Sequence, residues 1–304
     1  MAHIHTFNDA DIIDITIESV LKQTRPVDGI LVVDNASTDN TLDQPSLKHV
    51  TVVRHQENLG TSGAVVTGMR FALERGYDWI WVFDADSVPE LDALEKLLRL
   101  HGELPETVRD VTAFLACLPR NHGDDRPHHG VVFTRKGIAI ARPLQDERHY
   151  LCHVTIWSGC LYPLAAILQV GLPNHNYVLD WGEFEYGYRM MKAGYHGFIH
   201  QDSILQHNIR GAPSFHAVEL NLGFATATVY EFPPIRCYYM SRNMLYFALY
   251  DVELERFGLG RRVVWTVFRL TANFLLRPRN HGAQILACLR GIWHGITGNV
   301  VARY

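Results

Sequence analysis

The sequence predicts an α/β protein with a mostly parallel sheet, a mixed second half and C-terminal helices. The first observation is a set of four short segments whose near-continuous hydrophobicity is typical of strands buried on both faces. These segments are residues 2–6, 29–33, 50–54 and 79–83. The second is that helical patterns at 12–23 and 61–75 alternate with them, as in parallel sheets. The third is that each apolar segment ends in polar residues.

The two helices of this first half have recognisable ends. Asn8 or Asp9 is suited to cap the first helix, and Pro26 follows its last turn. In the second helix the apolar residues recur at helical spacing, and Gly76 is suited to end it. Both helices are long enough to cover a face of the sheet.

The second half is expected to be less regular, and residues 119–129 have the Gly, Pro and polar composition of a surface loop. The further strands expected are 111–118, 131–133, 138–141, 152–157, 194–200 and 203–207. The further helices expected are 91–100, 162–170, 234–250, 261–276 and 281–294. We therefore expect one domain at 1–232, with halves at about 1–118 and 119–232, and a helical region at 233–304.

Composition places the chain among ordinary globular proteins. Its 304 residues are 47% hydrophobic and 20% charged, and the net charge of -4 argues against general nucleic-acid binding. The five cysteines are scattered without any C-x-x-C pair, which fits a reducing compartment and argues against a zinc site. No apolar run approaches the ~18 residues that span a bilayer. We expect a soluble or peripheral protein in the cytoplasm.

Two carboxylates, Asp84 and Asp86, follow the apolar segment that ends at Phe83. Two acids at the edge of a buried sheet repel each other unless a cation lies between them, and carboxylate oxygens suit Mg²⁺ or Mn²⁺. This favours a divalent metal site. The alternative is a turn in which Asp86 or Ser87 caps the next helix and Pro89 takes its first position. The Asp-x-Asp pattern alone leaves both interpretations open.

Thr6, Asp34, Asn58 and Asp84 each lie at or just after the end of a predicted strand. The carboxyl ends of parallel strands meet at one edge of a sheet, and ligands bind there. We therefore expect these four residues to face one binding site. Only Met1 to His5 precede Thr6, so either the first strand is short or the start of the chain is truncated.

A second acidic cluster spans residues 180–189. On a helix that begins near Gly182, Glu185 and Arg189 are four residues apart and can form an ion pair, whereas Glu183 lies on another face. Glu183 is therefore a candidate for chemistry. The alternative is an acid of the first helical turn that interacts favourably with the helix dipole.

The segment after Glu255 is basic and aromatic, and it contains no Asp or Glu. Its arginines are Arg256, Arg261, Arg262, Arg269, Arg277, Arg279, Arg290 and Arg303, and its large aromatic residues include Trp265, Phe268, Phe274 and Trp293. Such a segment can lie on an anionic membrane surface. The alternative is a set of helices that pack on the rest of the protein with their arginines facing solvent.

Several of these motifs occur together in a specific order. The pieces are Thr6-Phe7-Asn8, Val32 to Asp39, Asn58-Leu59-Gly60, Phe83 to Asp86, Ser158-Gly159, Asp180 to Arg189 and His207. This set resembles the family 2 inverting glycosyltransferases with the GT-A fold. The rhamnosyltransferase-like branch is most similar, because its members share Ser-Gly before the acidic motif and a segment like Tyr238 to Asn243. The likeness covers about residues 4 to 250.

The resemblance implies a Rossmann-like nucleotide-binding half and a nucleotide-diphosphate sugar as donor. Thr6 and Asn8 would line the nucleotide pocket, and Asp34 would lie near the base. Asn58 would belong to the same donor site, and Asp84 would reach the ribose. The acceptor would be a saccharide or a lipid-linked molecule in the synthesis of cell-surface polysaccharide.

The resemblance also implies a Mg²⁺ or Mn²⁺ ion at Asp86 and His207, where the cation would stabilise the charge on the leaving diphosphate. The catalytic acid motif of the family falls on Gly182-Glu183. Glu183 therefore stands where the family usually has an aspartate base, and Asp180 is a second candidate. A single base that activates the acceptor hydroxyl on the face opposite the leaving group gives inversion.

Trp157, Ser158 and Trp181 flank the acidic motif and are candidates for acceptor binding, in which aromatic faces would support a sugar. For Trp157 a position in the core is an equally good interpretation. Gly63 is followed by apolar residues where the family often has Gly-Gly and a polar residue. The transferred sugar is therefore open between rhamnose and a galactofuranose-like sugar.

Three other functions are to be distinguished from a transferase. A metal-dependent barrel hydrolase would use His3 and His5 as ligands, but the sequence lacks eight βα repeats. A nucleotidyltransferase should have a Gly-rich loop with Lys or Arg after the first strand, where Thr6 to Asp11 stands instead. A non-catalytic sugar-nucleotide binder would keep the donor residues without a working acid at Glu183.

Overall fold

A computed structural model describes the chain except for residues 136, 145–146, 211–215, 222–225 and 253–281. The chain forms two compact units. Unit 1 comprises residues 1–133, 138–175 and 182–211, and unit 2 comprises 134–137, 176–181 and 212–304. The contacts thus divide the chain after 211, whereas we expected a division after 232. The helix expected at 261–276 lies outside the described residues.

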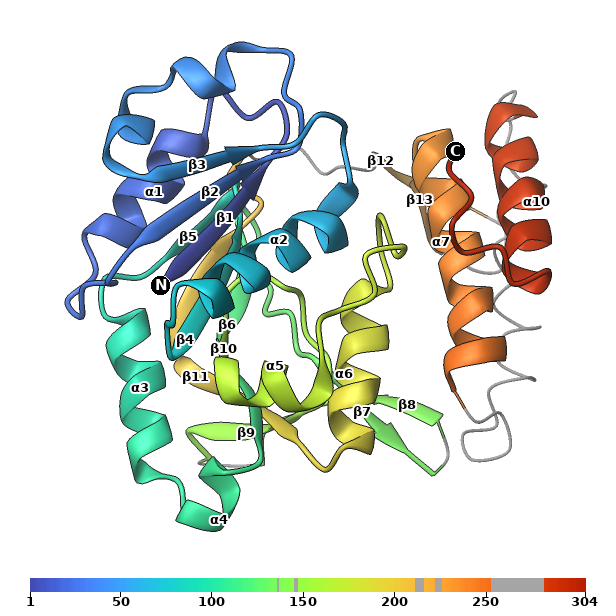
Figure 1. Cartoon of the computed structure of the whole chain (residues 1–304). Helices are drawn as coiled ribbons and strands as arrows, with labels where there is room; N and C mark the ends of the chain where they lie inside the picture. Colours follow the sequence, from blue (N-terminus) through green and yellow to red (C-terminus); the bar gives the residue numbers. More distant parts are fainter. Residues whose placement is uncertain (136, 145–146, 211–215, 222–225, 253–281) are drawn as a thin grey trace. The chain divides into compact units, whose positions relative to one another are not determined.

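Unit 1 is built on a nine-stranded sheet (Figure 1). Its strands are β1 (Ala2–Thr6), β2 (Ile30–Asp34), β3 (Thr51–Arg54), β4 (Trp79–Asp84), β5 (Ser87–Pro89), β6 (Thr112–Asn121), β9 (His149–Cys152), β10 (Cys160–Pro163) and β11 (His196–His207). The strand order is β3-β2-β1-β4-β10-β6-β11-β5, and β9 pairs with β11. Two shorter strands, β7 (Val131–Thr134) and β8 (Gly137–Ile140), pair with each other outside this sheet.

The first four strands are parallel, as the sequence predicts, and the second half of the sheet is mixed. β1 pairs in parallel with β2 and β4, and β2 pairs in parallel with β3. β10 is antiparallel to β4 and β6, whereas β6 and β11 are parallel. The expected α/β class with a mixed second half is confirmed.

Helices cover both faces of this sheet, which is why its strands read as continuous apolar runs. They are α1 (Ile13–Leu21), α2 (Gly60–Glu74), α3 (Ala93–Glu103), α4 (Glu106–Arg109), α5 (Leu164–Val170) and α6 (Gly182–Lys192), with the 3₁₀ helices η1 (Asn40–Asp43) and η2 (Pro45–His49). Alternate residues of each strand enter two separate cores. Val82 packs in the core with α2, α5 and α6, whereas Phe83 packs in the core with α1 and α3.

Three elements differ from the sequence predictions. Ser87–Pro89 forms β5 and pairs with β11, so the alternative of a helix that starts at Pro89 is wrong; α3 begins at Ala93. β11 is one strand where we expected two, and its pairing with β6 is irregular between His200 and Ile204. β9 ends at Cys152, where we expected a strand to begin.

Unit 2 contains a helical pair and a two-stranded hairpin. Its elements are β12 (His216–Asn221), β13 (Thr226–Glu231), α7 (Pro234–Tyr246), the π-helical turn η3 (Phe247–Asp251) and α10 (Gly282–Ile296). α10 packs closely on α7 because it presents glycines there. A Cβ atom on Gly291 would lie 2.4 Å from the carbonyl oxygen of Tyr238, and one on Gly295 would lie 2.8 Å from that of Arg242. Within the described ranges, no helix combines the length and apolar character needed to cross a bilayer.

A buried histidine, His153, follows β9 in unit 1. Its Nδ1 atom accepts a hydrogen bond of 2.9 Å from the backbone N–H of Phe133, which only the unprotonated nitrogen can do. Burial, with a contribution from the charge of His196, lowers the pKa of His153 to about 4. The folded protein therefore favours the neutral ring.

We expect this histidine to make unit 1 sensitive to acid. Because its pKa is lower in the folded than in the unfolded state, the unfolded chain binds more protons, and stability is lost as pH falls from about 6.5 towards about 4. The loss is about 2 kcal/mol by roughly pH 4.5. His153→Asn keeps an acceptor near the Nδ1 position but does not titrate. Its melting temperature, measured by circular dichroism, should fall less than that of the wild type over this range; equal falls would contradict the assignment.

Candidate active site

Residues at the carboxyl ends of the parallel strands meet at one edge of the sheet in unit 1. Thr6 is the register partner of Asp34, and His5 is the register partner of Asp84. The expectation that Thr6, Asp34 and Asp84 share an edge therefore agrees with the strand pairing. Asn58 follows β3, which is the neighbour of β2.

The loops that follow β1 and β2 are joined by hydrogen bonds. Asn8 has a φ of 59°, its N–H donates to Ser37 Oγ at 2.9 Å, and its Oδ1 accepts from the N–H of Thr38 at 2.8 Å. Thr6 Oγ1 donates to Asp9 Oδ2 at 2.8 Å. Thr6 and Asn8, which we expected to line a nucleotide pocket, thus shape a single two-loop wall.

Asp34 and Asn58 use their side chains mainly to fix backbone. The buried carboxylate of Asp34 accepts from the N–H of Ser37 at 3.1 and 3.2 Å and lies 3.3 Å from Arg54 Nε. The Asn58 Oδ1 atom accepts from the N–H of Gly60 at 2.8 Å, at the start of α2. Because the Asp34 carboxylate is buried, it would affect ligand binding indirectly, by holding the loop after β2 and the half-exposed Arg54 in place.

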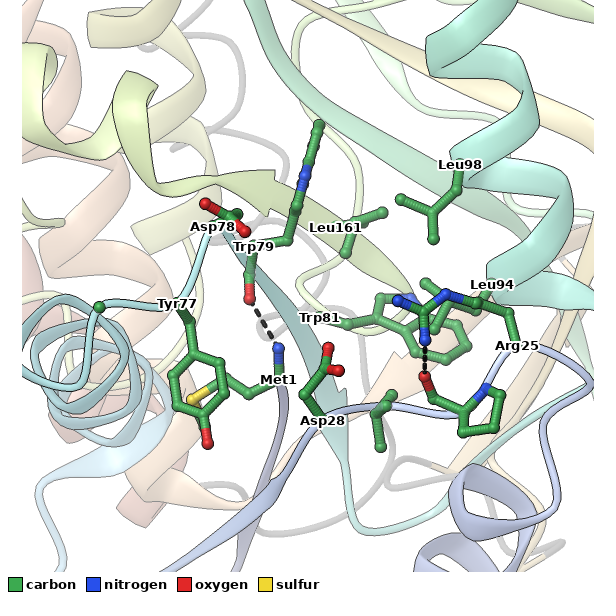
Figure 2. A pocket seen from close by; sticks show the side chains of 13 residues that line it. Met1, Arg25, Asp28, Tyr77, Asp78, Trp79, Trp81, Leu94, Leu98 and Leu161 are labelled. Carbon is green, nitrogen blue, oxygen red and sulfur yellow. Dashed lines mark hydrogen bonds between the residues drawn. The ribbon is translucent and has the colours of Figure 1, made fainter.

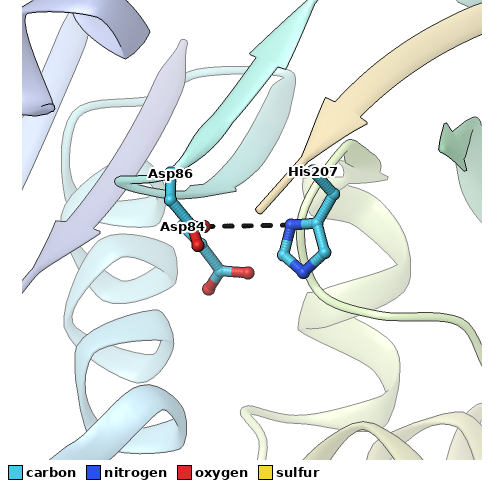
Figure 3. Close-up of side chains that lie close together, drawn as sticks. All are labelled: Asp84, Asp86 and His207. Carbon is cyan, nitrogen blue, oxygen red and sulfur yellow. Dashed lines mark ion pairs between the residues drawn. The ribbon is translucent and has the colours of Figure 1, made fainter. Parts of the chain in front are cut away.

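Asp84, Asp86 and His207 form the one group of three or more potential metal ligands in the described part of the chain (Figure 3). One ligand atom from each lies within 4.8 Å of the others. His207 Nδ1 is 3.8 Å from Asp86 Oδ1 and 2.7 Å from Ser87 Oγ. β5 and β11 produce this proximity, because His207 is the register partner of Ser87.

The pKa values of the two acids in the cluster are shifted in opposite directions. Burial would raise the pKa of Asp84, but the neighbouring His5, followed by His207 and His3, outweighs it and lowers the pKa below its usual value. Burial raises the pKa of Asp86, and the charge of Asp84 raises it further. Asp84 therefore carries the negative charge, whereas His207 and Arg210 compensate the charge of Asp86 only in part.

This donor set fits a divalent cation. Mn²⁺ accepts both carboxylate and imidazole ligands, so all three side chains suit it. Mg²⁺ prefers oxygen, so the two carboxylates suit it. The contact between His207 Nδ1 and Ser87 Oγ orients the ring, which is the usual arrangement around a metal-binding histidine. A cation there would also remove the repulsion that raises the pKa of Asp86.

Arg210, just beyond β11, closes the same edge of the sheet. Its guanidinium donates to Asp9 Oδ1 at 2.7 Å and to Asp11 Oδ1 at 2.8 Å. The N–H of Ile209 donates to the carbonyl oxygen of Asp86 at 3.1 Å. The strand that carries His207 is therefore tied both to the loop after β1 and to the acid pair.

The two acids in the first turn of α6 differ in their surroundings. Glu185 is buried and forms the expected ion pair with Arg189, whose guanidinium also donates to the carbonyl oxygens of Val170 and Leu172. Glu183 is half-buried. Burial is the main reason why the pKa of Tyr162 is raised, and Glu183 is one of the charges that add to it. Glu183 therefore interacts electrostatically with Tyr162 of β10, the strand next to β4.

Asp180 belongs to unit 2 and is held there. Its carboxylate accepts two hydrogen bonds from Arg236, at 2.8 and 3.1 Å, and its carbonyl oxygen accepts from Asn243 Nδ2 at 2.9 Å. Its φ of 60° is stabilised by these contacts. This engagement makes Asp180 a poor second candidate for the base.

The residues expected to bind an acceptor are placed differently from one another. Trp157 is buried and contacts the rings of Tyr162 and Tyr186, so it occupies the core position that was its alternative. Ser158 is also buried, and its Oγ accepts from the N–H of Asp84 at 3.0 Å. Neither offers an acceptor an accessible surface here. Trp181, in unit 2, is half-buried.

The roles of Ser87 and Arg210 at this edge, and the contact of His5 with Asp84, were not predicted from the sequence. Ser87 directly follows the Asp-x-Asp pattern and Arg210 follows His207 by three residues, so proximity to a motif was the available signal. His5 precedes Thr6 at the end of β1. Its neighbour across the sheet becomes known only with the strand register.

A pocket of about 430 Å³ lies at the opposite ends of the strands (Figure 2). Met1, which precedes β1, and Trp79, the first residue of β4, line it together with Asp28 and Leu94. The N-terminal ammonium donates to the carbonyl oxygen of Trp79 at 2.8 Å. The pocket is therefore separate from the edge of the sheet where Asp84, Asp86 and His207 lie.

Comparison with known proteins agrees with this geometry. The family model described as "Glycosyl transferase family 2" matches residues 2–162. The chain belongs to glycosyl transferase family 2. The match covers the four parallel strands and the acid pair of this family 2 chain.

Two curated relatives of this family 2 chain are distant. Galactofuranosyltransferase GlfT1 of Mycolicibacterium smegmatis is 23% identical over 205 residues, which are 64% of this chain and 65% of that protein. Undecaprenyl-phosphate mannosyltransferase of Micrococcus luteus is 34% identical over 100 residues, which are 31% of this chain and 41% of that protein. The matches span less than two thirds of either relative.

Solved structures confirm the GT-A fold of this family 2 chain. S. aureus TarS 1-349 has a TM-score of 0.55 at 15% identity, over 98% of this chain and 81% of that one. GalNAc-T7, solved with UDP, GalNAc and Mn²⁺, has a TM-score of 0.55 at 13% identity, over 90% of this chain and 56% of that one. The cluster of Asp84, Asp86 and His207 thus lies on a GT-A fold.

If Asp86 is a metal ligand, its removal should weaken nucleotide binding only when the metal is present. For Asp86→Ala we expect at least about tenfold weaker binding of UDP with Mn²⁺, measured by calorimetry, and little change in the presence of EDTA. Asp92→Ala, which removes a surface ion pair with Lys96, serves as the control. Equal loss with and without the chelator would argue against a metal at Asp86.

Proposed function

We propose that the protein is an inverting, metal-dependent glycosyltransferase that moves a sugar from a nucleotide-diphosphate donor to a saccharide or lipid-linked acceptor. The observation that carries this proposal is the cluster of Asp84, Asp86 and His207 at the edge where the loops after β1 and β2 meet. Membership of family 2 supports it.

The donor would bind along this edge. The two-loop wall of Thr6 and Asn8, fixed by Asp34, would receive the nucleoside, and Asn58 would support the same wall from the start of α2. Asp84 would reach the ribose. Asp86 and His207 would hold a divalent cation, which when bound supplies positive charge to the leaving diphosphate.

Glu183 is the acid that we assign as general base. It lies in the first turn of α6, in the acidic segment where the resemblance to family 2 implies the catalytic base. A base that takes the proton of the acceptor hydroxyl on the face opposite the diphosphate leads to inversion at the anomeric carbon and is worth about 10²- to 10⁴-fold in rate. As an acceptor platform, Trp181 of unit 2 stays a prediction from the sequence.

We propose a furanosyl or deoxyhexosyl donor sugar, with galactofuranose tested first and rhamnose second. The name of one relative, a galactofuranosyltransferase, supports the first choice, and rhamnose follows from the resemblance to the rhamnosyltransferase-like branch. The name of a second relative, an undecaprenyl-phosphate mannosyltransferase, supports an acceptor on a lipid carrier. We also propose a role in cell-surface polysaccharide synthesis.

The direct test is turnover of a panel of nucleotide sugars with Mn²⁺ or Mg²⁺. Mass spectrometry should detect slow hydrolysis of the correct donor without acceptor, and transfer with inverted anomeric configuration when a saccharide or lipid-linked acceptor is added. Binding of a donor without any turnover would favour the non-catalytic sugar-nucleotide binder. No binding of any nucleotide sugar would refute the proposed function.

Glu183→Gln should abolish transfer because the amide cannot accept the proton, with a loss of about 10²-fold or more in kcat. Binding of UDP with Mn²⁺ should remain near the wild-type value. Glu185→Gln on the same helix is the matched control: loss of the Arg189 ion pair should lower the melting temperature, while the folded enzyme keeps its turnover. Full transfer activity in Glu183→Gln would exclude this base.

We also propose that unit 2 contacts an anionic membrane surface from the cytoplasmic side. One face of α10 is exposed and apolar, and it consists of Leu286, Leu289, Trp293 and Ile296. The opposite face, with Gly291 and Gly295, packs on α7. Arg290 of α10 and Arg303, which follows α10, are both exposed to solvent. No Asp or Glu follows Glu255 in the sequence. An exposed apolar stripe with basic flanks is typical of helices that lie in a membrane interface.

The double variant Leu289→Gln/Trp293→Gln should bind vesicles containing phosphatidylglycerol at least about tenfold more weakly than the wild type, because two large apolar side chains no longer enter the interface. Cosedimentation measures this. Leu168→Gln, at an exposed apolar residue of α5, is the control and should bind normally. Unchanged vesicle binding by the double variant would remove α10 as the contact.

A further inference from the structure

Two histidines of β1, His3 and His5, are buried on the face of the sheet that α2 covers. Their rings stack with a centroid distance of 5.7 Å and an interplanar angle of 21°. Imidazoles in such a position are costly unless they have a specific partner, since their nitrogens lose water. The two histidines differ in what they contact.

His5 contacts the first acid of the Asp-x-Asp pair. Its Nε2 atom lies 2.6 Å from Asp84 Oδ1, and the two residues are register partners on adjacent parallel strands. The side chain of His5 is 8% exposed and that of Asp84 is 29% exposed, so the histidine approaches from the inner side. The N–H of Asp84 donates to the buried Ser158. Both the backbone and one carboxylate oxygen of Asp84 are therefore fixed.

His3 supports His5 by packing alone. Within the described residues no ring nitrogen of His3 or His5 makes a hydrogen bond of good geometry, but His5 has its ion-pair contact with Asp84, whereas His3 has no such contact. α2 comes so close that a Cβ atom on Gly68 would lie 2.6 Å from the His3 ring. His3 thus fills the space between α2 and the His5 ring, without contacting the acid pair.

The fixed position of Asp84 matters because its neighbour repels it. Asp84 and Asp86 are both partly withdrawn from water, and an oxygen atom of one carboxylate lies within 4.8 Å of an oxygen atom of the other. Without a cation, two such carboxylates lower their energy by turning apart. The contact with His5 opposes that movement and leaves Asp84 Oδ2 as the oxygen that is not engaged by His5.

We propose that His5 is a positioning residue, which holds the Asp84 carboxylate in the orientation that the cation and the donor diphosphate require. This inference rests on the proposed function. Preorganisation of this kind lowers the cost of binding, and loss of an outer partner of a metal site typically weakens metal affinity by about 10- to 100-fold.

The test measures binding of Mn²⁺ alone, by the electron paramagnetic resonance signal of the free ion, and of UDP with Mn²⁺ by calorimetry. His5→Leu removes the nitrogen at similar volume, and Mn²⁺ affinity should fall at least about tenfold. His5→Gln carries an amide near the position of Nε2 and should recover most of the affinity, whereas His5→Asn is too short to reach Asp84. The Gln and Asn variants decide the matter even if the Leu variant does not fold.

His3→Leu is the matched control, because it changes the neighbouring buried ring without touching Asp84, and its Mn²⁺ affinity should equal that of the wild type. In an Asp84→Asn background, His5→Gln and His5→Asn should no longer differ. In His5→Asn the KM for the donor should rise, relative to the wild type, by a larger factor than kcat falls.

Equal Mn²⁺ affinity in His5→Asn, His5→Gln and the wild type would overturn the inference and leave the proposed function standing. A loss in His3→Leu as large as that in His5→Asn would also overturn it, because general packing would then explain both. A wild-type protein that binds neither Mn²⁺ nor any nucleotide sugar would refute the proposed function, and this inference with it.

Discussion

The repulsion between Asp84 and Asp86 is the constraint on which the rest of this edge of the sheet depends. Two acids one residue apart, at the end of a strand buried on both faces, are unfavourable by themselves. The surrounding residues offset this in different ways: His5 engages one acid, and His207 lies beside the other. The remaining negative charge of the two acids is available to interact with a positively charged ligand.

The sheet delivers these residues from distant parts of the chain. β1 and β4 are adjacent because the chain crosses over between them through β2, β3 and the helices, which makes His5 and Asp84 neighbours. The three-residue β5 then pairs with the end of β11 and brings His207 to the acid pair. A short strand that would contribute little to stability alone thus sets the geometry of the cluster of Asp84, Asp86 and His207.

The first half of the fold could be predicted because strands buried on both faces leave an unbroken apolar signature, as in Ile80 to Phe83. β5 could not, since Ser87-Val88-Pro89 is too short for periodicity and its proline suggests a helix start. β11 looked like two strands because Gln201 and Asp202 interrupt the apolar pattern. Of the site, strand ends and motif residues were predictable, whereas the His5 contact depends on strand register, which local sequence does not encode.

The irregular pairing in β11 has a consequence for insertions and deletions. His200 and Ile204 pair with consecutive residues of β6, so the residues between them form an extra loop-out within the strand. Side chains alternate between the two faces of a strand, so adding or removing one residue there would turn His207 to the opposite face. Chimaeras with other family members must therefore change the length of this segment only by an even number of residues. This holds even though the segment is not paired with Asp84 or Asp86 in the sheet.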